Sequence, residues 1–231
     1  MKSIAVIQHT SAEYLGLIED HLEGRQIRFQ YFRPFTEQGR VPSLKSVSDG
    51  LILLGGGPWG SGGKRNAPSL VAEVELTYEC LKLGVPIVGI GLGAQILSLA
   101  AGGQTAESPL IFEVGYALRI VDDALNGYLP DRYPLIEYIR DRALPPSGAK
   151  ILSVNEHGNS ALFQIGENAF GFSGHPGAKV AMAEDLIMEF EESPLKASER
   201  LEPLRMMKTE IEDALVPIMT GLIQLTGLMR D

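Results

Sequence analysis

The segment at residues 85–95, Val-Pro-Ile-Val-Gly-Ile-Gly-Leu-Gly-Ala-Gln, constrains the fold more than any other part of the chain. It predicts a buried strand, a tight glycine turn and the start of a helix. In the pattern G-x-Nuc-x-G, such a turn forces the central residue outward, where it acts as a nucleophile. The central residue here is Gly91, which has no side chain. The sequence therefore predicts the turn without its reacting atom.

Composition narrows the classes of function that the chain can serve. Its 231 residues carry a formal net charge of −9, and we find no cluster of Lys and Arg, so we expect no nucleic-acid binding. The single cysteine, Cys80, cannot form an internal disulfide, and no Cys or His spacing indicates a metal site. We find neither a signal peptide nor a long apolar run, so we expect a soluble cytoplasmic protein without a membrane segment, metal or cofactor.

The first half of the chain alternates apolar segments of strand length with segments of helical periodicity. Strands are predicted at residues 4–7, 27–32, 51–54 and 85–88, and helices at residues 14–22, 69–83 and 92–101. Such alternation is typical of a doubly wound α/β fold, in which a mainly parallel sheet is flanked by helices. Ligands bind beyond the carboxyl ends of such strands, and both the glycine-rich loop at residues 55–58 and Gly91 fall there.

The second half predicts short strands that follow one another directly, and hence a small antiparallel extension of the sheet. These strands are expected at residues 113–121, 149–154, 161–165 and 170–172, with a helix at residues 184–191. From residue 201 onward, apolar residues recur at steps of three and four, which predicts two amphipathic helices separated at Pro217. We expect residues 1–231 to form a single domain whose C-terminal helical segment, residues 199–231, packs on its own core. A homodimer or partner-subunit contact through these helices is the alternative.

Several motifs, taken in order, point to one family. They lie at residues 51–58, 85–95, 113–116, 143–149 and 171–176. In that order they resemble the class I glutamine amidotransferases, and most of all the single-domain, GMP-synthase-like branch, over about residues 4–190. The resemblance implies a flavodoxin-like α/β fold in which an elbow cysteine attacks the side-chain amide of glutamine. It also implies a histidine that transfers the proton and a glutamate, two residues later, that orients the histidine.

Carried onto this sequence, the resemblance places the base at His175, but it places the nucleophile at Gly91 and the orienting acid at Gly177. It places the backbone N–H groups of the oxyanion hole at Gly56 and Leu92. Further positions are expected to contact a small-molecule ligand, glutamine or a related compound: Gly57, Gln95, Glu113, Gly115 and Tyr116.

Two of the three triad positions are glycine, so we expect no glutaminase activity, because loss of a nucleophile alone costs roughly six orders of magnitude in comparable triads. The leading hypothesis is a pseudoenzyme that binds a small molecule or has a regulatory role. Two alternatives stay open: an active enzyme that uses His175 with an unrecognised nucleophile, and a partner-binding subunit. Ser61 and Ser173 are within reach of the same crevice, whereas Cys80 is expected to be a buried apolar residue.

Other polar and aromatic residues have structural as well as functional interpretations. Lys64 and Arg65 are expected on a solvated rim or beside an anionic ligand, and Trp59 under the glycine loop or capping the crevice. His157 is expected in an exposed hairpin turn. His9 and His21 are expected in a loop and on a helix surface.

Overall fold

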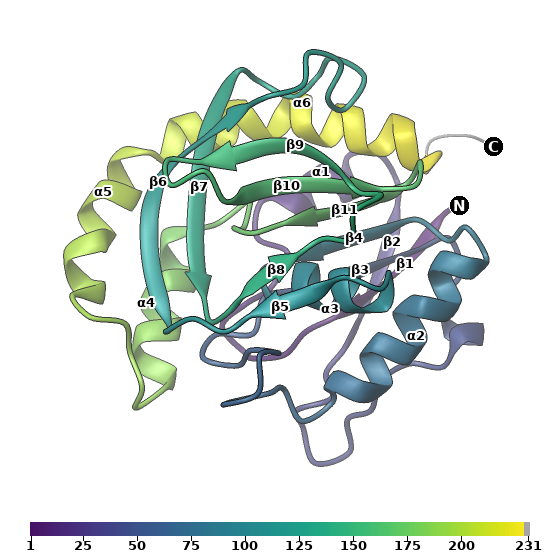
Figure 1. The fold of residues 1–231 in the computed structure, drawn as a ribbon, viewed down its shortest axis with the longest axis horizontal. Coiled ribbons are helices and arrows are strands. Elements are labelled where there is room, and N and C mark those ends of the chain that lie inside the picture. Colours follow the sequence, from purple (N-terminus) through teal and green to yellow (C-terminus); the bar gives the residue numbers. More distant parts are fainter. Residues whose placement is uncertain (229–231) are drawn as a thin grey trace.

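The structure, a computed structural model, describes residues 1–228 and is built around a nine-stranded sheet. The strands, in chain order, are β1 (Ser3–Ile7), β2 (Arg28–Phe32), β3 (Gly50–Leu53), β4 (Ile87–Ile90), β5 (Gln104–Ala106), β6 (Ile111–Arg119), β7 (Arg132–Ile139), β8 (Arg142–Leu144), β9 (Lys150–Asn155), β10 (Ser160–Ile165) and β11 (Ala169–Phe172). The large sheet has the order β2-β1-β3-β4-β11-β10-β9-β6-β7, and β5 pairs with β8 separately (Figure 1).

Six α-helices flank this sheet in the described part of the chain. They are α1 (Ile18–Glu23), α2 (Leu70–Lys82), α3 (Leu92–Ala100), α4 (Val180–Glu189), α5 (Leu201–Met206) and α6 (Lys208–Thr226), with 3-10 turns at Leu44–Ser46 and Ala197–Arg200. Strands β2, β1, β3, β4 and β11 pair in parallel, and β10, β9, β6 and β7 continue the sheet in antiparallel pairs. The predicted doubly wound α/β fold with an antiparallel extension is confirmed.

The core lies on both faces of the sheet, because alternate residues of a strand point to opposite sides. In β1, Ile4 and Val6 pack in a cluster with residues of α1 and α6, whereas Ala5 and Ile7 pack in a second cluster with residues of α2 and α3. A third cluster joins α4 and α5 to β6 and β7. The helices therefore form a layer on each face of the sheet (Figure 1).

Several boundaries differ from those expected. The helix predicted from residue 14 begins only at Ile18, because the preceding residues form the turn that carries the Tyr14 carbonyl to His175. The helix predicted at residues 184–191 spans Val180–Glu189 instead. Strand β7 was not predicted, because it contains Pro134 and nearly all of its residues are buried, so it shows no alternation.

The expected break at Pro217 is wrong. Pro217 lies inside α6, and the two C-terminal helices meet at Met207. Proline removes one backbone hydrogen bond from a helix, but here the buried side chains of Leu215 and Ile218 on either side of it pack on the core and hold α6 together. The first prediction, that this segment packs on the chain's own core, agrees with that burial, while a dimer or partner contact stays a prediction.

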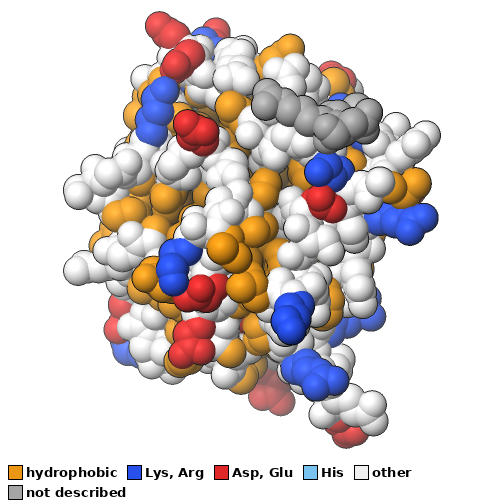
Figure 2. Space-filling view, turned by 90° about the vertical axis from the view of Figure 1, so that its right-hand side faces the viewer, with side chains coloured by type: hydrophobic (Ala, Val, Ile, Leu, Met, Phe, Trp, Pro, Cys, Tyr) orange, Lys and Arg blue, Asp and Glu red, His pale blue; other side chains and the backbone are white. Residues whose placement is uncertain are grey.

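The surface shows little segregation of charge on the face drawn in Figure 2, where acidic and basic side chains lie interspersed among hydrophobic ones. None of the helices within residues 1–228 combines the length and the apolar character that crossing a membrane requires.

Packing of α6 can be tested by shortening one side chain. Leu215 is fully buried in the cluster under α6, and the neighbouring Val216 is 52% exposed. Leu215→Ala is expected to lower the free energy of unfolding by about 2–5 kcal/mol, because it removes buried methyl groups and leaves a cavity. Val216→Ala should change it by less than about 0.5 kcal/mol. Urea denaturation of both variants checks this, and equal effects would contradict the packing of α6.

Candidate functional site

The turn between β4 and α3 has the backbone of a nucleophile elbow. Gly91 adopts φ 57° and ψ −114°, a conformation that side-chain-bearing residues rarely take, and its N–H donates a hydrogen bond of 2.8 Å to the Phe172 carbonyl. A Cβ atom built at Gly91 would lie 3.3 Å from the Gly55 Cα and 4.0 Å from the Ser173 carbonyl oxygen. The Gly55 backbone would have to shift by a few tenths of an ångström to admit even the first atom of a side chain at this position.

The retained histidine, His175, lies close to Gly91, and both of its ring nitrogens contact backbone groups. His175 is buried and lines a small cavity of about 30 Å³ with Gly91. Its Nε2 lies 2.8 Å from the Tyr14 carbonyl oxygen, and its Nδ1 lies 3.1 Å from the Gly177 backbone nitrogen. Because a carbonyl only accepts and an amide N–H only donates, the ring is neutral with its proton on Nε2.

Burial reinforces this state of the ring. It lowers the pKa of His175 to about 4, because the buried ring loses the water that would stabilise the charged imidazolium. Both ring nitrogens already have backbone partners, so neither is free to take a proton from a nucleophile. In this arrangement the imidazole is a structural link between the turn before α1 and the turn after β11.

The position of the orienting acid is filled by apolar side chains. A Cβ atom built at Gly177 would lie 3.1 Å from the Ile18 Cγ1 and 3.2 Å from the Leu215 Cδ2, closer than ordinary van der Waals contact. The Gly177 carbonyl accepts a hydrogen bond of 2.9 Å from the Leu17 N–H. A glutamate at this position would have to displace α1 or α6 side chains, and the Tyr14 carbonyl already orients His175.

A carboxyl group that the sequence reasoning missed lies at the glycine loop. Glu13 is 5% exposed and lines the small cavity with Gly91 and His175. Its carboxylate accepts a hydrogen bond from the Gly57 N–H, one of the loop groups expected to face a ligand. Burial raises the pKa of Glu13 to about 7, because the apolar surroundings disfavour the carboxylate.

The buried pair of His9 and Glu73 contacts the same glycine loop. The His9 Nε2 lies 2.7 Å from the Glu73 carboxylate and its Nδ1 lies 3.0 Å from the Gly55 carbonyl oxygen. Burial alone would lower the pKa of His9, but the charge and hydrogen bond of Glu73, together with the Gly55 carbonyl and the Glu13 charge, outweigh it, and the pKa is raised. Both neighbours accept hydrogen bonds, so His9 is an imidazolium. It lies in a loop as predicted, but it is buried, and no sequence spacing linked it to Glu73.

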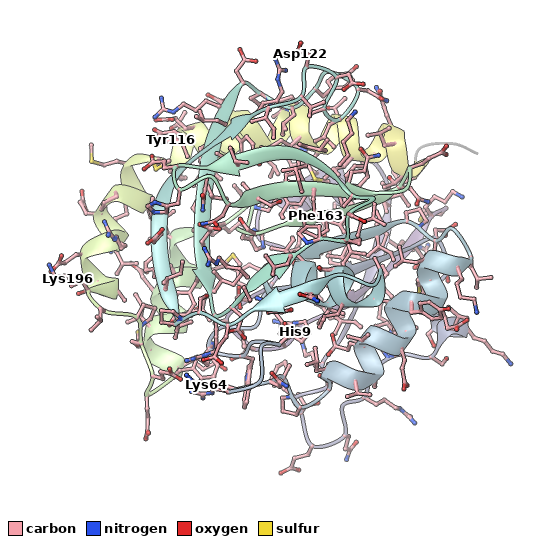
Figure 3. The ribbon with its side chains drawn as sticks, in the orientation of Figure 1. His9, Lys64, Tyr116, Asp122, Phe163 and Lys196 are labelled. Atoms are coloured by element: carbon pink, nitrogen blue, oxygen red, sulfur yellow. The ribbon has the colours of Figure 1, made fainter. Side chains whose placement is uncertain are left out.

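A cleft of about 500 Å³ opens on the other side of Gly91, and Glu113, Glu137 and Phe163 line it. Gly115 and Tyr116 line an adjoining hollow of about 300 Å³, which shares Glu113 and Glu137 with the cleft. Figure 3 shows Phe163 near the centre of the molecule and Tyr116 at the outer edge, on β6.

Some expected ligand contacts are engaged within the protein. The Gln95 amide is buried, and its Nε2 donates 2.7 Å to the Arg140 carbonyl while its Oε1 accepts 2.6 Å from the Ser61 hydroxyl. The Tyr116 hydroxyl donates to Glu210 at 2.9 Å. Leu92 begins α3, with its side chain against Gly56. The expected ligand roles of all these residues stay predictions.

The other candidates lie in structural settings. Burial raises the pKa of the Cys80 thiol to about 11, so it is not a reactive thiolate. Lys64 pairs with Glu107, and the Arg65 guanidinium lies 5.0 Å above the Trp59 ring. Within the described residues, no group of three or more His, Cys, Asp or Glu side chains is placed to hold a metal ion.

Comparison with known sequences agrees with this geometry. The profile of the family described as glutamine amidotransferase class-I matches residues 11–190. The chain is 30% identical over 164 residues to a GMP synthase [glutamine-hydrolyzing] of Aeropyrum pernix, covering 68% of this chain and 30% of that protein. It is 27% identical to the carbamoyl phosphate synthase small chain of Vibrio parahaemolyticus, covering 60% of this chain and 36% of that protein.

Solved structures share the fold over nearly the whole chain. A glutamine amidotransferase from Methylobacillus flagellatus superposes with a TM-score of 0.81 at 24% identity, covering 97% of this chain and 95% of that one. One from Thermotoga maritima superposes with a TM-score of 0.79 at 22% identity, covering 97% and 98%. The chain belongs to the class I glutamine amidotransferase family, as its motifs indicated. The sequence matches span only about a third of the curated relatives.

The buried carboxyl group of Glu13 predicts a pH dependence of stability. Its folded-state pKa of about 7 lies above its ordinary value of 4.5, so the folded chain binds more protons than the unfolded chain between these values. Stability should therefore fall as the pH rises through this window. Between pH 4.5 and pH 8, the free energy of unfolding of the unaltered chain is expected to fall by on the order of 3 kcal/mol more than that of the Glu13→Gln variant. Urea denaturation at both pH values measures this, and a pH-independent difference would contradict it.

The filled acid position gives a second prediction. Gly177→Glu should lower the free energy of unfolding by about 2 kcal/mol or more, because it places a carboxylate between Ile18 and Leu215. Gly177→Ala, which adds only the Cβ atom, should cost less. Thermal denaturation ranks the two variants. A Gly177→Glu chain as stable as the parent would show that the acid position is still open.

Proposed function

We propose that this chain binds a small molecule in the cleft over Gly91 and does not hydrolyse glutamine. The observation that carries this proposal is the state of the triad positions: no side chain at Gly91, a histidine with both nitrogens bonded to backbone, and apolar side chains at the acid position. Acyl transfer needs a nucleophile and a base with a free nitrogen, and this arrangement has neither.

The cleft supports the binding half of the proposal. Its volume of about 500 Å³ falls within the range of small-molecule sites, and polar side chains converge on it from β6, β7 and the β9–β10 hairpin. The missing side chain at Gly91 leaves the floor of the cleft open. The GMP synthase relative is named as glutamine-hydrolyzing, and we take from that name only the approximate size of the ligand.

The alternative is an active enzyme that uses another nucleophile, and the position of Ser173 suggests it. Ser173 lines both the cleft and the small cavity, and its hydroxyl is the obvious candidate. However, His175 cannot serve as its base without giving up a backbone hydrogen bond. We therefore assign Ser173 as a contact for a ligand and not as a nucleophile.

Ammonia release from glutamine tests the proposal. The unaltered chain should release no more ammonia than a buffer blank, and His175→Ala and Ser173→Ala should leave this unchanged, because no triad operates. Gly91→Cys should gain a thiol that iodoacetamide alkylates at the elbow, which reports that the position is accessible while Cys80 stays buried. Ammonia release by the unaltered chain that disappears in His175→Ala or Ser173→Ala would contradict the proposal.

A further inference from the structure

A groove separate from the cleft lies where the C-terminal helices meet the turn after β11. Its volume is about 360 Å³, and it is bordered by the turn before α1, the start of α4, helix α5 and the first residues of α6. In Figure 1 these elements lie at one side of the molecule, with α5 between α4 and the beginning of α6. None of the residues that line this groove lines the cleft over Gly91.

Aliphatic side chains from several segments of the chain form the floor of the groove. Leu204 and Ile211 are almost fully buried and belong to the cluster that joins α4 and α5 to β6 and β7. Leu17 and Val180 are half-buried against the same cluster, and Ala178 completes the floor. A recessed surface of this kind favours an alkyl chain, because each CH₂ group that it takes from water is stabilised there.

Two lysines at the rim make the groove locally positive. Lys179 immediately precedes α4 and forms no ion pair within residues 1–228. Lys208 begins α6, its side chain is 72% exposed, and its Nζ lies 3.9 Å from the Glu212 carboxylate, beyond hydrogen-bond distance. Glu212 also lines the groove, so two lysines and one glutamate leave a net positive charge here, on a chain whose total charge is −9.

We infer that this groove binds a small monocarboxylate with an alkyl chain, such as a medium-chain fatty acid. The alkyl chain lies on the aliphatic floor, and the carboxylate lies at the rim, where it accepts hydrogen bonds from the ammonium groups of Lys179 and Lys208. The volume of the groove falls in the lower part of the range of small-molecule sites. This inference goes beyond the proposed function and does not rest on it, because the two sites share no lining residue.

A second copy of this chain is the other occupant to consider, since apolar patches on helices also serve self-association. Stable interfaces bury about 800 Å² on each partner. Here Leu204, Ile211 and Ala178 are already buried in the single chain and offer little surface to another protein. The groove therefore fits a slender ligand better than a second copy, and the experiment measures the oligomeric state as well.

Calorimetric titration with three probes tests the inference: octanoate, hexanoate and octylamine. Octanoate should bind at about millimolar concentration or below. Hexanoate should bind about tenfold more weakly, because it lacks two CH₂ groups and each contributes about fourfold when buried. Octylamine should also bind at least about tenfold more weakly, because its positive charge meets the two lysines.

Variants at the rim locate the carboxylate. Lys179→Gln and Lys208→Gln should each weaken octanoate binding by about threefold, and Glu212→Gln should tighten it by a similar factor, because it removes a like charge. The matched control is Lys45→Gln, which removes an exposed lysine from the 3-10 turn at Leu44–Ser46 and should leave binding unchanged.

A variant at the floor locates the alkyl chain. Val180→Asp puts a carboxylate on the apolar floor and should weaken octanoate binding by at least about tenfold. Val180 is the first residue of α4, where an acidic side chain interacts favourably with the helix, so the variant should fold. A melting temperature close to that of the parent confirms that weaker binding does not reflect unfolding.

Three results would overturn the inference: no binding of octanoate, equal binding of octanoate and octylamine, or octanoate binding that a folded Val180→Asp chain retains in full. A dimer in light scattering that Val180→Asp dissociates would assign the groove to a second copy and overturn it as well. These outcomes are separate from the ammonia-release assay. A chain that hydrolyses glutamine refutes the proposed function alone, and one that binds no octanoate refutes the carboxylate groove alone.

Discussion

The turn at Gly91 is the constraint on which the arrangement of the site depends. Its positive φ lets β4 pass directly into α3, and its N–H bonds to the carbonyl at the end of β11. That hydrogen bond brings together the ends of the two neighbouring parallel strands, and Ser173 and His175 follow β11 immediately. The glycine loop after β3 ends at the same edge of the sheet. As a result, one backbone turn determines where the cleft, the small cavity and the retained histidine lie.

Around this turn, the polar groups that would serve catalysis are satisfied by the protein itself. The Tyr14 carbonyl and the Gly177 N–H hold His175, and the Glu13 carboxylate accepts the Gly57 N–H. Each of these contacts stabilises the folded arrangement of the site, because a buried donor or acceptor without a partner costs free energy. Within the described residues, buried hydroxyl groups without a hydrogen-bond partner occur on both sides of Gly91: Tyr138 lines the small cavity, and Ser160 lines the cleft. Contacts within the protein thus hold the histidine and the glycine loop, and the larger open space beside Gly91 is the cleft of about 500 Å³.

Local sequence patterns predicted the parallel half of the fold because each of its strands and helices carries its own signal. The strands at residues 4–7 and 51–54 are short apolar runs bounded by turns, and the helix at residues 69–83 has a clear periodicity and ends beside Gly84. Strand β7 lacked such a signal because both of its faces are buried. Pro217 gave a false signal, since the packing of α6 outweighs the loss of one backbone hydrogen bond.

The site could be predicted only where family motifs carry it. Gly91, His175 and Gly177 follow from the order of the motifs, but Glu13 and the pair of His9 with Glu73 do not. Their partners lie more than forty positions away in the chain, and no local spacing encodes such contacts. The placement of Glu113 opposite Glu137 in the cleft depends in the same way on the register of β6 against β7, which requires a strand that the sequence did not reveal.

The state of the His175 ring tests the central claim most directly, because a base that is bonded to backbone through both nitrogens cannot act in catalysis. The ring nitrogens can be observed by ¹⁵N NMR from pH 4 to pH 8, with the signals assigned by their absence in His175→Ala. We expect a neutral ring with its proton on Nε2 throughout the range above about pH 5, consistent with the pKa of about 4. A ring that titrates near the ordinary pKa of 6.5, or that carries its proton on Nδ1, would contradict the account.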